Sequence, residues 1–134
     1  MAMKENYLPV QASYLRCCAS TGFFDTFYEI FLQKSPEVAK KFVNTDLKRL
    51  KGMLRESLFQ MICQSSIEGR EAEIERIAEI HSRRGHDVVP ELYPLWLDSL
   101  CEAVKRHDPG YTAELESIWR RRMEQGIAIM VARY

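Results

Sequence analysis

The chain has 134 residues, of which 19 are basic and 19 acidic, so its formal net charge at pH 7 is zero. Overall charge therefore gives no basis for binding nucleic acid or an anionic membrane surface. The length fits one domain spanning residues 1–134, and a hydrophobic content of 46% is ordinary for a folded soluble protein.

Export and membrane signals are not evident in the sequence. No apolar run approaches the ~20 residues that span a bilayer, and the start "MAMKENYLPVQ" lacks the apolar core of a secretory signal. We therefore expect a cytoplasmic protein with no membrane partner. Cys17, Cys18, Cys63 and Cys101 follow neither a disulfide framework nor the paired spacing of a zinc site, which predicts reduced cysteines.

Apolar residues recur with helical spacing almost throughout, and no stretch alternates with period two, so we predict an all-α fold. The first expected helix carries an apolar stripe made of Tyr7, Val10, Tyr14, Leu15 and Cys18. A second helix begins at Phe23 with an aromatic face and ends before Pro36. Pro36 can itself open a short third helix, "PEVAKKF".

Longer helices are predicted in the rest of the chain. "NTD" at 44–46 provides capping oxygens for a helix with Leu47, Leu50, Leu54, Leu58, Met61 and Ile62 on one face. The next runs from Glu71 to about Arg83, where His81 extends an apolar stripe, and Gly85 ends it. Residues 92–104 form another, and the last holds Leu115, Ile118, Trp119, Met123, Ile127 and Met130.

A lone histidine on an apolar helix face, such as His81, is usually a core or boundary residue with ordinary partners. The other segments of the sequence change this interpretation. "FFDTFYEIFLQKSPEVAKKF", "NTDLKRLKGMLRESL", "IAEIHSRRGHDVVPELYPLW" and "IW…GIAIM" together resemble a bacterial single-domain globin of the myoglobin-like group, over nearly the whole chain. Tyr28, Pro36, Phe42 and His81 keep the order and approximate separations of the globin distal tyrosine, C-helix proline, haem-stacking phenylalanine and proximal histidine.

The resemblance implies a globin fold with helices A, B, C, E, F, G and H, without helix D, around haem b (iron protoporphyrin IX). His81 would bind the iron as the proximal ligand, with its other ring nitrogen held by a backbone carbonyl near Ile77. Phe42 would stack against the porphyrin. The alternative for Phe42 is an ordinary core phenylalanine.

On the distal side, Tyr28 would donate a hydrogen bond to iron-bound dioxygen and slow its release. The alternative is a core tyrosine bonded to the backbone. Related sequences commonly have a glutamine where this chain has Leu50, which makes Leu50 and Leu54 the pair over the iron; a shift of one turn would choose Leu54 and Leu58. Because that helix offers no histidine, we predict a vacant or water-bound sixth position.

The proximal edge carries a cationic cluster, Arg83, Arg84 and His86, which either pairs with the haem propionates, through Arg84 or His86, or is solvated surface charge. Tyr93 matches a tyrosine that flavohaemoglobin-like relatives have near the proximal histidine. Those relatives also have a glutamate late in helix H that polarises the proximal histidine. Its position is occupied by Tyr134 in this chain, so a peroxidase-like role is not favoured. Two roles, haem-pocket wall and packed core residue, explain Val89, Leu97 and Met130 equally well.

The leading functional hypothesis is a globin that reversibly holds dioxygen, or else NO or CO, for storage, scavenging or sensing. The first alternative is a nitric oxide dioxygenase or peroxidase-type haem enzyme. It would need a separate reductase, since the flavin- and nicotinamide-binding pattern "GxGxxG" is absent. The second is a globin-fold signalling or interaction module. We expect a monomer, or a homodimer through helices G and H. Partial exposure of Trp96, Trp119 and Met123 would favour the dimer, but buried aromatics are the expected state.

Overall fold

A computed structural model describes residues 8–62, 76, 78–79 and 89–132. Its helices are α1 (Leu8–Ala19), α2 (Phe23–Phe31), α3 (Pro36–Lys41), α4 (Leu47–Ile62), the 3-10 helix η2 (Pro90–Leu92), α6 (Tyr93–His107) and α7 (Ala113–Ala132). No strand occurs in these residues, which confirms the all-α prediction. Phe42–Asp46, between α3 and α4, contains no helix, as expected for a fold without helix D.

Local sequence signals set the helix boundaries. Gly22, before α2, has a φ of 87°, a left-handed conformation that glycine adopts at little cost. Ser35 caps α3 by accepting a 3.3 Å hydrogen bond from the Val38 amide, and Pro36 fills the first helical position. Asp46 accepts a 3.1 Å bond from the Lys48 amide at the start of α4. Three of the predicted helix starts therefore have a clear physical cause.

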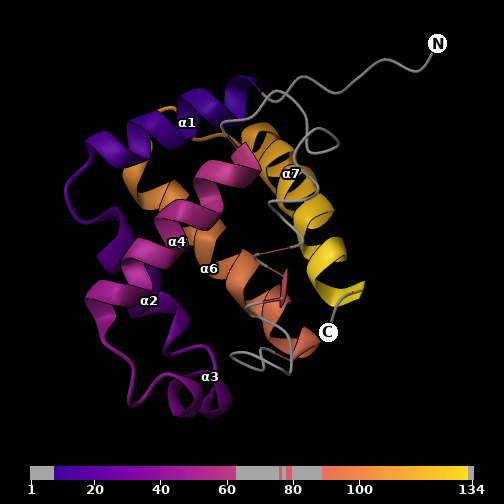
Figure 1. The fold of residues 1–134 in the computed structure, drawn as a ribbon. Helices are drawn as coiled ribbons and strands as arrows, with labels where there is room; N and C mark the ends of the chain where they lie inside the picture. Colours follow the sequence, from indigo (N-terminus) through magenta and orange to yellow (C-terminus); the bar gives the residue numbers. More distant parts are fainter. Residues whose placement is uncertain (1–7, 63–75, 77, 80–88, 133–134) are drawn as a thin grey trace.

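Helix α6 lies at the centre of the described fold, where it contacts α1, α2 and α7 (Figure 1). Helix α4 packs on α1 and α7. The core between them includes Val10, Phe27, Leu58, Leu100 and Trp119, each fully buried. Trp119 and Met123 are 0% exposed within the single chain, as expected for buried core residues, so these two do not mark a dimer surface.

The buried face of α1 differs from the predicted stripe. Leu15 is 64% exposed and Cys18 is also exposed, whereas Ser13 and Cys17 are fully buried. Ser13 was missed because a serine reads as a surface residue. Its hydroxyl accepts a 3.0 Å hydrogen bond from the Trp119 indole and donates one of 2.5 Å to Asp108, so its polarity is satisfied inside the core.

Asp108, the residue that caps the end of α6, is buried and joins α6 to α1. It accepts hydrogen bonds from Ser13, from Arg16 at 2.5 and 2.9 Å, and from the Gly110 amide at 2.8 Å. Burial alone would raise the pKa of this carboxyl, but the bonds from Arg16, Ser13 and Gly110 outweigh it and hold the pKa below its usual value. Asp108 is therefore a charged, fully bonded group at neutral pH.

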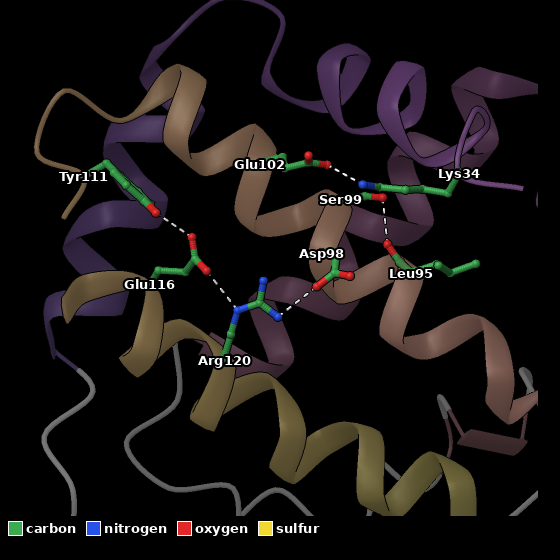
Figure 2. A network of polar contacts seen from close by, with 8 residues as sticks. All are labelled: Lys34, Leu95, Asp98, Ser99, Glu102, Tyr111, Glu116 and Arg120. Carbon is green, nitrogen blue, oxygen red and sulfur yellow. Dashed lines mark hydrogen bonds and ion pairs between the residues drawn. The ribbon is translucent and has the colours of Figure 1, made fainter. Parts of the chain in front are cut away.

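A second polar network joins α6 to α7 on their outer side (Figure 2). Arg120 bonds Asp98 and Glu116, each at 3.0 Å, and the Tyr111 hydroxyl donates to Glu116. Nearby, Lys34, after α2, forms a 2.7 Å ion pair with Glu102 of α6. These pairs are partly exposed, so each contributes only ~0 to 1 kcal/mol to the contacts of α6 with its neighbours.

In the described part of the chain, none of the helices is both long and apolar enough to cross a membrane.

Candidate functional site

A cavity of about 480 Å³ opens between α2, α4, α6 and α7. This size is typical of small-molecule and cofactor sites. Most of its wall is apolar or aromatic and comes from Phe31, Phe42, Leu50, Met53, Leu54, Met61, Leu92, Trp96, Ile127 and Met130. The cavity can therefore enclose a ligand whose body is apolar.

Helix α4 supplies one side of the cavity. Leu50 and Leu54, one turn apart, both line it and are at most 7% exposed. Leu58 is 0% exposed, but it does not line the cavity. Of the two leucine pairs considered for this helix, Leu50 and Leu54 is therefore the pair that lines the cavity. Met53, Ser57 and Met61 also line the cavity.

Tyr28 of α2 lines the cavity and is 6% exposed. Its hydroxyl donates a 2.9 Å hydrogen bond to the backbone carbonyl of Leu50, across the α2–α4 contact. Burial raises its pKa well above the ordinary value, so the phenol is neutral and keeps its proton. The alternative of a backbone-bonded tyrosine therefore describes Tyr28 in this structure. Any other acceptor would have to replace the Leu50 carbonyl.

Two more predicted residues, Phe42 and Tyr93, lie at the same cavity. Phe42 follows α3, is half-buried, and its ring centroid lies 5.9 Å from that of Phe31. Tyr93 begins α6, and burial raises its pKa to about 12. Both therefore add an uncharged aromatic side chain to the cavity lining.

The cavity opening is polar, unlike its walls. We assign the opening to the end of α3, the turn after it and the start of α4, because the lining residues there are the half-buried Lys41 and the exposed Asn44, Thr45, Asp46 and Arg49. Lys41 and Arg49 could pair with anionic groups at the end of an otherwise apolar ligand. The sequence interpretation placed such cations on Arg84 or His86 and did not consider these two.

The remaining predicted site residues are distributed as follows. Leu97 is buried and Val89 half-buried in the core, but neither lines the cavity. Met130 does line the cavity, which agrees with a pocket wall, one of the two roles considered for it. Ile77, His81, Arg84 and His86 lie outside the described residues. In the part of the chain that the structure describes, no group of three or more His, Cys, Asp or Glu side chains is placed to hold a metal ion.

Several cavity residues were not among the predicted site residues: Phe31, Met53, Ser57, Met61, Leu92, Trp96 and Ile127. Most of them have the helical periodicity of core residues, so periodicity alone cannot separate a cavity wall from a packed interior. The spacing of Leu50, Met53, Leu54, Ser57 and Met61 on one face of α4 is a signal that could have found three of them.

The described residues thus form an all-α fold with a largely apolar cavity, a tyrosine hydroxyl in its wall and two cations among its lining residues. The chain is similar to a solved structure from Pseudomonas aeruginosa PAO1 of a protein described as structurally highly homologous to a human hemoglobin. The TM-score is 0.88 and the sequence identity 40%, and the match covers 96% of this chain and 97% of the other. No family model and no curated protein matches the sequence. Because of the 40% identity to this hemoglobin-like structure over 96% of its length, the chain belongs to the globin family.

Proposed function

We propose that the protein binds haem b in this cavity and uses the iron to hold dioxygen, or another diatomic gas such as NO or CO, reversibly. The observation that carries the proposal is the apolar cavity between α2, α4, α6 and α7 in a chain of the globin family. Its size, its aromatic walls and its cationic opening fit a flat apolar ring with two carboxylate side chains.

In this proposal each residue has a separate task. His81 is the iron ligand, and Phe42 packs against the ring. Leu50 and Leu54 cover the gas-binding side and exclude water from it. Lys41 and Arg49 at the opening join Arg84 and His86 as candidates to pair with the propionates. Haem, when bound, supplies the open coordination position at which the gas is held.

The hydrogen bond of Tyr28 limits what this residue adds to gas binding. To donate to a bound gas, the hydroxyl must leave the Leu50 carbonyl. A neutral buried hydrogen bond contributes about 1 kcal/mol, and the exchange gains only the difference between two such bonds. We therefore propose that Tyr28 stabilises bound dioxygen only slightly and that release is faster than the sequence-based interpretation implied.

The test is the visible absorption spectrum of the full chain after it is purified with haem available. We expect an intense Soret band, lost in His81→Ala and restored in that variant by added imidazole. His107→Gln is the matched control, because the His107 ring nitrogens lie 2.7 Å from the Ser20 and Thr26 hydroxyls, and His107 does not line the cavity. A folded but colourless protein, or a Soret band unchanged in His81→Ala, would refute the proposal.

A further inference from the structure

Positive charge is concentrated at the corner between α3 and α4. From Lys40 to Arg55 the chain carries six of its 19 basic residues but only one of its 19 acidic residues, Asp46. Since the whole chain is neutral, the remaining residues carry a net negative charge. This segment therefore carries a local excess of positive charge, which attracts a negatively charged partner.

Internal pairing accounts for only part of this charge. Lys51 forms a 2.7 Å ion pair with Asp25, and the guanidinium of Arg55 lies 4.8 Å from the centre of the Phe24 ring. Lys40, Lys48 and Arg49 are exposed. None of these three has an ion pair with another residue in the part of the chain that the structure describes. Their charges are therefore presented to solvent.

Two exposed aliphatic side chains lie among these cations. Val43 is 73% and Leu47 is 42% exposed, although both are large and apolar. We name Lys40, Val43, Leu47, Lys48 and Arg49 the corner face. Exposed apolar side chains together with charged ones are common in protein–protein contacts. The corner face also adjoins the cavity opening, which includes Lys41, Asn44 and Arg49.

We propose that the corner face is the docking surface for the acidic face of an electron-donor protein. This proposal rests on the proposed function. Ferric iron does not hold dioxygen, so an oxidised globin must receive one electron. The donor loses that electron, the iron gains it, and no bond or proton is exchanged. In this proposal the electron comes from a separate protein that reaches the cavity opening.

The charged residues of the corner face fit a brief encounter rather than a permanent complex. Electron-transfer contacts are small, below about 1,200 Å², and depend on charge to form quickly. Such contacts weaken in salt, because the Debye length falls from ~30 Å at 0.01 M to ~3 Å at 1 M ionic strength. Binding through the corner face should therefore be strong only at low salt.

A binding experiment without electron transfer tests the surface directly. The probe is oxidised flavodoxin, an acidic flavin protein, added to the ¹⁵N-labelled full chain at about 0.01 M salt. We expect amide shifts centred on residues 40–49 that disappear near 1 M salt. Shifts centred elsewhere, or no binding at low salt, would overturn the proposal. Because this measurement does not require reducible iron, it remains decisive if the chain binds no haem, which would contradict only the proposed function.

Charge reversal then separates the corner face from overall charge. Lys40→Glu/Lys48→Glu and the control Lys105→Glu/Arg106→Glu change the net charge equally, and none of these residues lines the cavity. At low salt, the rate constant for reduction of the ferric protein by reduced flavodoxin should fall about tenfold or more in the corner variant and less than about threefold in the control. An equal decrease of the rate constant in both variants would show that only net charge matters. An unchanged rate constant in the corner variant would show that the corner face is not part of the contact.

Discussion

At the scale of single residues, Asp108 links chain stability to pH. Its carboxylate accepts bonds from Ser13, Arg16 and Gly110, and these bonds hold its pKa below the ordinary value of about 3.9. A carboxyl whose pKa is lowered by folding stabilises the fold above its unfolded pKa. That contribution is lost as the pH falls through the folded pKa. We therefore expect the contact between α1 and the end of α6 to weaken below about pH 4.

Asp108→Asn should lower the free energy of unfolding by about 3 kcal/mol at pH 7, because Arg16 loses its charged partner and Ser13 loses an acceptor in the core. Urea unfolding followed by circular dichroism measures the change. The matched control is Asp98→Asn, since Asp98 is half exposed in its pair with Arg120 and should cost less than about 1 kcal/mol. The effect of Asp108→Asn should shrink below about pH 4; a constant difference down to pH 2 would contradict this account.

Tyr28→Phe should raise the dioxygen dissociation rate by less than about fivefold, which corresponds to about 1 kcal/mol, because the hydroxyl is already bonded to the Leu50 carbonyl. Stopped-flow displacement of dioxygen by CO measures the rate. Tyr93→Phe, which removes a hydroxyl from another cavity residue, is the control and should change it less than twofold. A rise of tenfold or more in Tyr28→Phe would mean that the hydroxyl turns to the gas when the gas is bound.

At the scale of elements, two glycines inside helices lie in different surroundings. Gly52 of α4 has nothing within 4 Å of the position that a Cβ atom would occupy. At Gly126 of α7, a Cβ atom would lie 2.3 Å from the terminal methyl of Met61. Glycine at position 126 therefore permits the close approach of α4 and α7 beside the cavity.

Gly52→Ala should raise the free energy of unfolding by about 0.5–1 kcal/mol, because alanine favours the helix and meets no obstacle there. Gly126→Ala gains the same helix propensity but must displace the buried Met61 side chain, which lines the cavity. We expect no net stabilisation and weaker haem binding in Gly126→Ala. Thermal unfolding and haem titration of the two variants test this. Equal stabilisation with unchanged haem affinity would show that Met61 moves aside freely.

At the scale of the whole molecule, the sequence was sufficient to predict the all-α fold, because apolar residues recur with helical spacing. Gly22, Ser35 and Pro36 also mark helix ends that do not depend on distant contacts. The buried face of α1 was not predictable in the same way. Ser13 is buried only because Trp119 and Asp108, 106 and 95 residues away, supply its hydrogen bonds.

The candidate site was predicted in part for a related reason. Phe42, Leu50, Leu54 and Tyr28 were found through the resemblance to globins, and they do line the cavity. Trp96 and Met61 were missed, since a helix gives cavity walls and packed core the same apolar period. The roles assigned to His81 and its neighbours stay predictions, because those residues lie outside the described part of the chain.

Haem should also stabilise the whole chain, since a ligand bound only by the folded state raises the free energy of unfolding by ~2.7 kcal/mol at a hundredfold excess over its Kd. We expect the melting temperature to rise with haem concentration in the unaltered chain and to rise much less in His81→Ala. Thermal melts at several haem concentrations measure this. An identical rise in both proteins would mean that haem binds without His81.

The two tryptophans give the molecule a pair of built-in optical reporters at different places. Trp96 lines the cavity, whereas Trp119 is fully buried with its indole bonded to Ser13 beside Asp108. In a Trp96→Phe protein the remaining fluorescence comes from Trp119 alone, so its emission wavelength follows the wetting of the α1–α6–α7 junction. In a Trp119→Phe protein the remaining emission follows what enters the cavity. Filling of the cavity and loosening of the fold can thus be observed separately in solution.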